Sequence, residues 1–396
     1  MQSFDVINQA PRRILFGPGV SARLADLARG MGSRKLLLVT DDGLFRTGIP
    51  GALHIRLAAA GLACEVYHDF VGEPNEAVVD AAIARFRAGD FDLVIGVGGG
   101  SALDTAKAVA ALGRGNLSVA QVYGKDTISE RRVPLILIPT TAGTGSEATP
   151  NALFIDANRT KQAVISPYLL PDVALLDPDL TSKLSPDITA YTGMDALSHC
   201  VESWLSLNGN PLSESYAYEG IRLIADSLVA AVVNGADIEA RGNMLMGSLL
   251  GGMALTIAGT AAIHALSYPL GKRGVPHGIA NGLLMPRVLR FNLPEAEERL
   301  ADLAPAFGLD GLTRGDRAVA VVRFVEELVL RLPVPKRLGE VGIDASEIPA
   351  MASESILNQR LLRNNPRPVD QVTAEMIYRE CLKNMDEISR NGGWTS

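Results

Sequence analysis

The spacing of apolar residues changes its period once along the chain. From residue 12 to about residue 185, β-branched runs alternate with stretches of helical spacing, a pattern typical of a parallel sheet covered by helices. The pattern predicts two helices, Val78–Arg87 and Ala102–Leu112, and strands at Lys35–Thr40, Cys64–His68, Leu93–Val97, Leu135–Ile138 and Ala174–Leu176.

After Pro186 the spacing is helical almost throughout, and glycine and proline fall mainly at the joints. Long helices are predicted at Ile188–Ser206, Leu212–Val233 and Ile238–Ala258. Since 396 residues exceed what one core usually supports, we expect an α/β domain over residues 1–185 and an all-helical domain over residues 186–396. A cleft between two such domains is a common place for a ligand site, because both walls contribute polar groups.

Composition narrows the class of protein. Hydrophobic residues make up 47% of the chain and charged residues 20%, as in globular proteins, and no apolar run approaches the roughly 20 residues of a membrane-spanning helix. The N-terminal segment lacks the apolar stretch of a secretion signal, so we expect the protein in the cytoplasm. A net charge of −7 without a basic cluster argues against nucleic acid or an anionic membrane as partner and favours small-molecule chemistry.

A glycine-rich turn follows the predicted strand Leu93–Val97 and opens a helix. In the sequence GVGGGSALDTAK, the bare backbone of Gly98, Gly99 and Gly100 and the hydroxyl of Ser101 can approach a phosphate, and the helix dipole favours its negative charge. The spacing differs from the G-x-G-x-x-G dinucleotide fingerprint, so a tight turn without a ligand is the alternative. A second turn of small residues, PTTAGTGSEAT from Pro139, offers further hydroxyls and backbone donors.

The candidate metal ligands are one carboxylate and three imidazoles. Asp195 and His199 are four residues apart in a predicted helix, which places both side chains on one face. His264 lies in a helix-like stretch, and His277 follows Pro276 in an expected turn. Such a set suits Fe²⁺ or Zn²⁺, whereas Mg²⁺ and Ca²⁺ prefer oxygen ligands. Chance clustering of structural histidines is the alternative.

Several motifs in order resemble one family, the iron-containing (group III) alcohol dehydrogenases of the dehydroquinate-synthase-like superfamily. The resemblance spans nearly the whole chain, through FGPG from Phe16, GGGSALDTAK, PTTAGTGSEAT, GMDALSHCVES, HALSYPLGKRGVPHGIAN and NPRP from Asn365. It implies an N-terminal NAD(P)-binding α/β domain, a C-terminal helical metal-binding domain, and an active site in the cleft between them. It also implies an assembly of identical subunits, a dimer or larger.

The resemblance assigns roles to single residues. Asp195, His199, His264 and His277 match the family's metal ligands. Asp41 matches an acidic residue that holds the adenosine ribose, which favours NAD over NADP because a carboxylate repels a 2′-phosphate. The family's pyrophosphate loop matches Gly98, Gly99, Gly100, Ser101 and Asp104, and its second cofactor turn matches Thr140, Thr141 and Thr144. Positions that border substrate or cofactor match Asn151 and Lys161. Pocket positions match Leu255 and Thr260.

The implied reaction is hydride transfer between NAD and a short-chain primary alcohol or aldehyde, with Fe²⁺, or else Zn²⁺, as a Lewis acid on the substrate oxygen. Many family members carry a proton-relaying histidine where this chain has Tyr268. A phenol, with a pKa of about 10, is a poor base at neutral pH. Either the proton leaves through water and the ribose hydroxyls, or Tyr268 simply packs, and packing is the favoured alternative.

Three alternatives stay open from the sequence. Lys272, Arg273 or Arg363 could face the pocket and select an anionic semialdehyde, although solvated cations are the simpler interpretation. A metal-dependent lyase or cyclase of the dehydroquinate-synthase type would need a pocket rich in cations, and the four-ligand pattern with aspartate argues against it. A nucleotide-binding regulatory protein without a metal would not need all four ligands.

Overall fold

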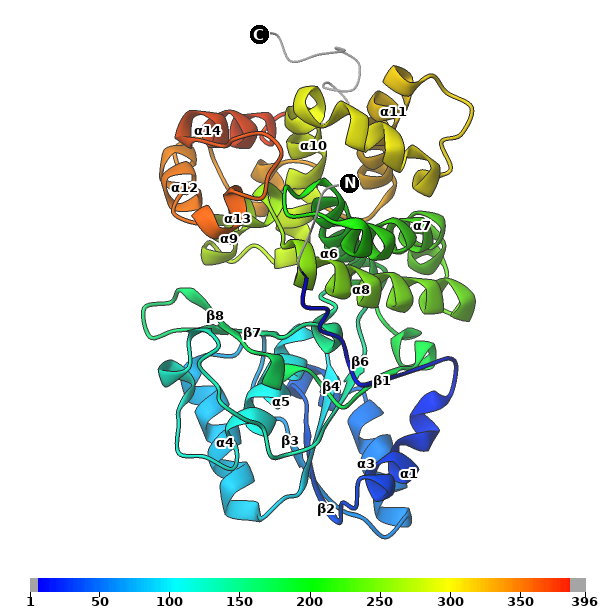
Figure 1. Cartoon of the computed structure of the whole chain (residues 1–396), viewed down its shortest axis with the longest axis vertical. Helices are drawn as coiled ribbons and strands as arrows, with labels where there is room; N and C mark the ends of the chain where they lie inside the picture. Colours follow the sequence, from blue (N-terminus) through cyan, green and yellow to red (C-terminus); the bar gives the residue numbers. More distant parts are fainter. Residues whose placement is uncertain (1–5, 385–396) are drawn as a thin grey trace. The chain divides into compact units, whose positions relative to one another are not determined.

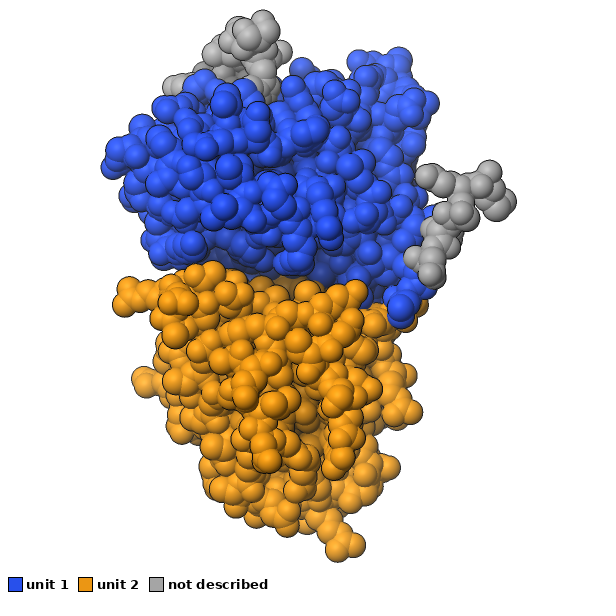
Figure 2. Space-filling view, turned by 60° about the vertical axis from the view of Figure 1, so that its left-hand side comes forward, with its two compact units in different colours: residues 1–7, 184–396 blue, residues 8–183 orange. Residues whose placement is uncertain are grey.

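The structure, a computed structural model, describes residues 6–384, which fall into two compact units. Unit 2 contains residues 8–183, and unit 1 contains the residues from Leu184 onward, with Val6 and Ile7 grouped with it (Figure 2). The division lies two residues before the expected boundary at 185/186.

Unit 2 is built on a six-stranded sheet in which every strand pair is parallel, as the alternating pattern predicts. The strand order is β1-β9-β6-β4-β2-β3, so β4 and β6 are central and β1 and β3 are the edges (Figure 1). The strands are β1 Arg13–Phe16, β2 Lys35–Val39, β3 Ala63–Tyr67, β4 Leu93–Gly98, β6 Leu135–Pro139 and β9 Val173–Leu176. The helices are α1 Leu24–Gly30, α2 Asp42–Phe45, α3 Ile49–Ala59, α4 Glu76–Gly89 and α5 Gly100–Leu112.

The two faces of this sheet bury different sets of side chains. Along β2, Leu36 and Leu38 pack with α1 and α3, whereas Leu37 and Val39 pack with α4 and α5. This alternation follows from the period of two in a strand. Because both faces are covered, the central strands are continuously apolar, as parallel sheets of this kind require.

A second, smaller sheet in unit 2 was not expected from the sequence. It has the order β5-β8-β7, where β5 is Gly124–Lys125, β7 is Asn151–Ile155 and β8 is Lys161–Ile165. β7 and β8 form an antiparallel hairpin whose loop is held by Asp156, which accepts hydrogen bonds from the backbone N–H groups of Asn158 and Thr160. β7 and β8 are short and only half buried, and β5 is exposed, so their apolar signal is weak beside that of the main sheet.

The described residues of unit 1 form helices joined by loops, without a strand, which confirms the predicted fold class. α6, α7 and α8 pack against one another, and α10 packs against α6, α9 and α11. Ser185, Asn210 and Asp237 cap the first three helices with their side chains. The helices are α6 Pro186–Leu205, α7 Pro211–Val233, α8 Ile238–Ala258, α9 Ala262–Lys272, α10 His277–Leu303, α11 Arg314–Arg331, α12 Ile348–Ser355, α13 Gln359–Leu362 and α14 Gln371–Glu380.

Within residues 6–384, no single helix has both the length and the apolar content to cross a membrane. Only α8 and α9 taken together reach that composition, and the chain bends by 106° between them.

Candidate metal centre and nucleotide-binding turns

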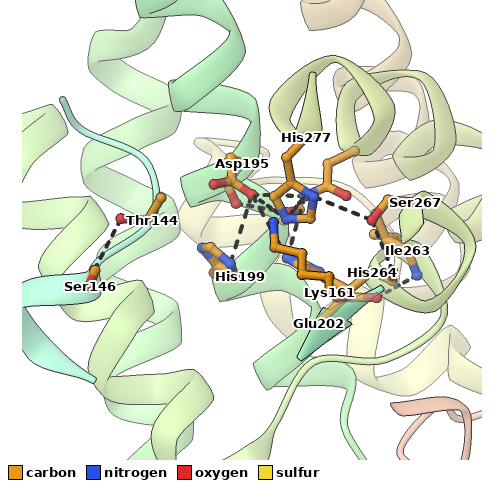
Figure 3. A network of polar contacts seen from close by, with 12 residues as sticks. Thr144, Ser146, Lys161, Asp195, His199, Glu202, Ile263, His264, Ser267 and His277 are labelled. Carbon is orange, nitrogen blue, oxygen red and sulfur yellow. Dashed lines mark hydrogen bonds and ion pairs between the residues drawn. The ribbon is translucent and has the colours of Figure 1, made fainter. Parts of the chain in front are cut away.

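Three helices of unit 1 bring the four predicted metal ligands together (Figure 3). Asp195 and His199 lie one turn apart on α6 and share a face, as their spacing predicts. His264 is in the first turn of α9. His277 is the first residue of α10 and not part of a turn, because Pro276 takes the N-cap position and starts the helix. The expectation of a turn at His277 was therefore wrong.

Each of the three histidines places its Nε2 atom close to one carboxylate oxygen of Asp195. Asp195 Oδ1 lies 3.8 Å from His199 Nε2, 3.8 Å from His264 Nε2 and 3.6 Å from His277 Nε2. Ligands about 2.1 Å from a tetrahedral ion lie about 3.4 Å from each other, so these separations are close to those a first-row divalent metal needs. Asp195, His199 and His264 keep their ligand atoms within 4.8 Å of one another. The donor set therefore fits Fe²⁺ or Zn²⁺.

The electrostatics of the cluster favour an ionised carboxylate. Asp195 is buried, and burial by itself would raise the pKa of its carboxyl group. His199, His277 and His264 act in the opposite direction, together with a hydrogen bond from Asn281, and the net effect is a lowered pKa for Asp195. A negative ligand is thus kept among the three imidazoles.

Two further polar residues belong to this cluster, and the sequence analysis missed both. Asn281 Nδ2 donates to Asp195 Oδ1 at 2.8 Å and lies 3.3 Å from the Nε2 atoms of His264 and His277. Glu202 contacts His264 from the other side of the ring. Their spacing was a usable signal, because Asn281 is one helical turn after His277 and Glu202 is one turn after His199.

The glycine-rich turn in unit 2 has the geometry of an anion cradle. Gly99 is the N-cap of α5 and provides no side-chain cap for the first N–H groups of that helix. Gly98 has a φ of 150°, which side chains rarely adopt, and a Cβ on Gly100 would lie 2.8 Å from Thr144 Cγ2. Glycine is required at both positions, and the exposed N–H groups at a helix start fit a pyrophosphate.

The second turn packs directly against the first. A Cβ added to Gly99 would meet the hydroxyl of Thr141, and Thr144 Oγ1 accepts a hydrogen bond from the backbone N–H of Ser146 at 3.2 Å (Figure 3). Thr140 is buried, and its N–H donates to Gly98 O at 3.0 Å. The structure therefore brings the predicted cofactor residues Gly98, Gly99, Gly100, Ser101, Thr140, Thr141 and Thr144 into one region of unit 2.

Asp104 was also predicted to bind the cofactor, but both oxygens of its carboxylate are bonded within unit 2. Its carboxylate is buried and accepts hydrogen bonds from the Ser146 hydroxyl at 2.5 Å and from the Leu153 N–H at 2.9 Å. Lys107, one turn later and fully buried, lies 3.5 Å from the same carboxylate. The observed role of Asp104 is to join α5 to the second turn and β7, because both of its oxygens are already bonded within the unit.

Asp41 stands at the end of β2 beside the glycine-rich turn. Its Oδ1 accepts a hydrogen bond from the Leu44 N–H at 3.0 Å and so caps α2. Its Oδ2 would lie 3.5 Å from a Cβ on Gly98. Asp42 is engaged elsewhere, since it pairs with Arg46 at 2.7 Å and approaches His68 Nδ1 at 3.4 Å.

The predicted substrate-bordering residues fall in both units, and each is described within its own. In unit 2, the backbone oxygen of Asn151 accepts a hydrogen bond from Lys107, and Lys161 Nζ donates to Glu73 at 2.6 Å. In unit 1, Leu255 and Thr260 are partly exposed near the end of α8 and just after it. Thr260 O accepts a hydrogen bond from Asn364 at 2.8 Å, which fixes the backbone just before His264.

Tyr268 lies beside the metal cluster. Its ring centroid is 6.5 Å from that of His277, with a tilt of 32° between the planes. The expected packing contact is therefore present in the structure.

The cations that could have selected an anionic substrate are mostly paired. Arg273 donates to Glu347 at 2.8 Å and to Glu354 at 3.1 Å, and Lys272 lies 3.5 Å from Glu354. All four side chains belong to unit 1. Arg363 is exposed. The guanidinium of Arg273 is thus neutralised by two carboxylates.

A parallel sheet with a phosphate-binding turn, combined with a largely buried cluster of one aspartate and three histidines, defines enzymes that use a dinucleotide together with a divalent metal. A family model described as iron-containing alcohol dehydrogenase matches residues 11–178, and one described as the C-terminal part of the Fe-containing alcohol dehydrogenase family matches residues 189–382. The chain belongs to the iron-containing alcohol dehydrogenase family.

Individual relatives agree with this assignment. The chain is 39% identical over 378 residues to long-chain-alcohol dehydrogenase 1 of Geobacillus thermodenitrificans, covering 92% of this chain and 95% of the relative. The crystal structure of a 1,3-propanediol oxidoreductase superposes with a TM-score of 0.92 at 32% identity, over 96% of this chain and 100% of the other. Sulfoacetaldehyde reductase from Bifidobacterium kashiwanohense, solved with NAD⁺, gives a TM-score of 0.88 at 30% identity, over 96% and 99% of the two chains.

The comparisons confirm the family, the fold and the enzyme class predicted from the sequence. The protein is an oxidoreductase acting on CH–OH groups, in a family that uses iron and NAD. The lyase and regulatory alternatives are set aside by this assignment.

Proposed function

We propose that this chain is an NAD-linked, metal-dependent dehydrogenase of neutral, short-chain primary alcohols, which also reduces the corresponding aldehydes. The observation that carries the proposal is the convergence of His199, His264 and His277 within 3.6 to 3.8 Å of one carboxylate oxygen of Asp195. Fe²⁺ is the proposed ion, with Zn²⁺ as the alternative, because both accept mixed nitrogen and oxygen ligands.

The protein residues supply binding and orientation for this reaction. When bound, the metal supplies Lewis acidity toward the substrate oxygen, and the nicotinamide exchanges a hydride with the carbinol carbon. Asp195 contributes the negative ligand and the three histidines contribute neutral ones, so the site keeps a net positive charge when a divalent ion is present. Asn281 donates to Asp195 and restrains the orientation of that carboxylate.

We propose NAD as the preferred cofactor over NADP because of Asp41. The pyrophosphate would bind at the start of α5, where Gly98, Gly99, Gly100 and Ser101 present backbone N–H groups and a hydroxyl. Asp41 stands next to Gly98 and can accept hydrogen bonds from ribose hydroxyls. A 2′-phosphate at the same place would meet a like charge, which costs binding energy.

A neutral substrate is favoured over an anionic semialdehyde because Arg273 and Lys272 are both paired with glutamates. Both cations are held by carboxylates of the same unit, so neither has its full charge available to a ligand. The relatives named above act on different substrates: a long-chain alcohol, 1,3-propanediol and sulfoacetaldehyde. The pocket of this chain is therefore proposed from its own residues, with Leu255 apolar and Thr260 bearing one hydroxyl.

The proposal is tested by NADH oxidation with protein purified without oxygen and loaded with Fe²⁺ or Zn²⁺. The substrate panel contains neutral aldehydes of increasing chain length and, in parallel, anionic semialdehydes and sulfoacetaldehyde. We expect the highest kcat/KM for a short neutral aldehyde. A preference for the anionic members would replace the neutral class, and no turnover with any aldehyde would contradict the dehydrogenase assignment.

A histidine variant and its matched control test the ligand assignment. His264→Ala should lose metal binding and turnover while NAD binding stays within about twofold, because the cofactor turns belong to the other unit. His54→Ala, a histidine of α3 in unit 2, should leave all three properties unchanged. Full metal content in His264→Ala would show that His264 is not a ligand. The oligomeric state and the cytoplasmic location stay predictions from the sequence.

A further inference from the structure

Glu202 is a buried carboxylate beside the metal cluster, and the hydride transfer described above assigns it no role. Glu202 is on α6, and only 3% of its surface is exposed. One of its oxygens lies 2.5 Å from His264 Nδ1, and the other accepts a hydrogen bond from the Ile263 N–H at 2.6 Å (Figure 3). Both oxygens therefore contact the first turn of α9.

The position of Glu202 on its helix explains this reach. Asp195, His199 and Glu202 are separated by four and three residues, so all three side chains project from one face of α6. Asp195 and His199 on that face are predicted ligands. Glu202, the third residue, contacts the Nδ1 side of the His264 ring, which is turned away from Asp195. Burial of a carboxylate is costly unless it is hydrogen-bonded, and Glu202 has a donor for each oxygen.

The contact with Glu202 decides which nitrogen of His264 can bind a metal. An ionised carboxylate only accepts hydrogen bonds, so its contact with Nδ1 of His264 requires the proton of the ring to be on Nδ1. Nε2 then carries no proton, and Nε2 is the atom 3.8 Å from Asp195 Oδ1.

The other oxygen of Glu202 fixes the helix that carries the ring. The N-cap position of α9, Ala261, has no side-chain hydrogen bond to the helix start. The N–H of Ile263 is one of the donors that a helix start leaves without an intrahelical partner, and Glu202 accepts it. A negative charge at this place also favours the positive end of the helix dipole.

We propose that Glu202 is a positioning residue of the metal centre, which holds His264 with Nε2 as its metal-binding atom and anchors the first turn of α9. The inference rests on the metal site proposed above. Carboxylates that orient a metal-bound imidazole typically change metal affinity by about 10- to 100-fold when they are removed.

Glu202→Gln separates this role from simple packing. Glutamine has nearly the same shape but only one accepting oxygen. If that oxygen accepts from Ile263, the amide NH₂ faces Nδ1 of His264 and shifts the ring proton to Nε2, the metal-binding atom. If the oxygen faces His264 instead, the Ile263 N–H loses its partner and the turn is loosened. Either arrangement weakens the site.

The experiment measures the dissociation constants of Zn²⁺ and Co²⁺ for the metal-free protein by competition with a chelator, and the visible spectrum of bound Co²⁺. The control is Glu326→Gln, because Glu326 is equally buried at 3% exposure but pairs with Arg290 on α10. We expect the dissociation constants of Glu202→Gln to rise by at least about tenfold with an altered Co²⁺ spectrum, and those of Glu326→Gln to stay within about twofold of the wild type.

Several outcomes would overturn the proposal. If the metal-free Glu202→Gln protein melts at a lower temperature but keeps the wild-type dissociation constants, Glu202 only stabilises α9. An equal loss of affinity in both variants would also reject a specific role. If the wild-type chain binds neither metal, the metal site itself fails, and this inference fails with it.

A second measurement does not depend on a variant that folds. The Zn²⁺-loaded wild type can be labelled with ¹⁵N-histidine, and the chain has only five histidines to assign. We expect His264 to be protonated at Nδ1 and bound to zinc through Nε2. Binding through Nδ1 would overturn the proposal.

Discussion

Lys107 Nζ donates a hydrogen bond to Ser146 Oγ at 2.7 Å, and both residues are buried. The same ammonium group donates to Asn151 O at 2.7 Å and to Thr149 Oγ1 at 3.2 Å. Lys107 belongs to α5, whereas its partners belong to the second turn and to the start of β7. One side chain thus fastens the glycine-rich turn and the second turn of unit 2 to each other.

Gly100→Ala should weaken NAD binding. Its Cβ would lie 2.8 Å from Thr144 Cγ2, and Thr144 has little freedom because its hydroxyl accepts from Ser146. We expect the NAD dissociation constant, measured by quenching of protein fluorescence, to rise on the order of tenfold. The control is Gly51→Ala in α3, where a Cβ meets nothing within 4 Å and helix propensity favours alanine by roughly 1 kcal/mol. Unchanged affinity in Gly100→Ala would argue against a cofactor at this turn.

Glu147→Gln should remove a pH dependence of stability. Burial raises the pKa of Glu147 from its usual 4.5 to about 7, although a backbone hydrogen bond and Lys107 oppose this. Because the pKa of Glu147 is higher in the folded than in the unfolded protein, its contribution to stability is fully present below about pH 4.5. This contribution is lost as the pH rises through about 7. The loss amounts to at most roughly 3 kcal/mol between these limits.

Urea unfolding of the wild type and of Glu147→Gln at pH 5 and pH 8 checks this prediction. When the pH is raised from 5 to 8, we expect the free energy of unfolding of the wild type to fall by roughly 2 to 3 kcal/mol more than that of the variant. A difference that stays constant with pH would show that Glu147 is not protonated in the folded protein.

Asp41→Asn should shift the cofactor preference toward NADP. Asparagine keeps an oxygen that can accept from Leu44 and cap α2, so the change removes the charge and preserves the helix start. We expect the ratio of kcat/KM for NADPH to that for NADH to rise by about tenfold or more. Asp42→Asn is the matched control, because Asp42 is already paired with Arg46 at 2.7 Å. A larger shift in the control would transfer the role to Asp42.

Tyr268→Phe should leave the pH dependence of kcat/KM nearly unaltered. The ring contact with His277 does not require the hydroxyl, so the variant keeps the packing. We expect kcat to stay within about twofold of the wild type across pH 6 to 9. Disappearance of a titrating limb in the profile would identify Tyr268 as part of the proton path.

The parts of the fold and site that were predictable depend on short, regular spacing. The central strands and α8 follow from local apolar periods, and Asp195 and His199 share a face because helical geometry fixes residues four apart. The hairpin of β7 and β8 was missed because its strands are only half buried. His277 was wrongly expected in a turn, because a proline such as Pro276 is common both in turns and at the start of a helix.

Asp104 and Glu202 show a different limit. Asp104 stands within a phosphate-binding motif, yet its carboxylate is bonded to Ser146 and Leu153, which lie more than forty residues away. The partner of Glu202 is 62 residues distant. Spacing along one helix indicates which face a side chain occupies, but only tertiary packing determines which group meets it there.

The four proposed ligands come from α6, α9 and α10, which together form much of the packed interior of unit 1. A cation bound by all three helices would act as a cross-link that only the native arrangement offers. Ligands of this kind stabilise the folded state by about 2.7 kcal/mol at a concentration one hundred times the dissociation constant. Shortage of metal in a cell would then shorten the lifetime of the polypeptide as well as stop turnover, and the abundance of this enzyme would follow the supply of its ion.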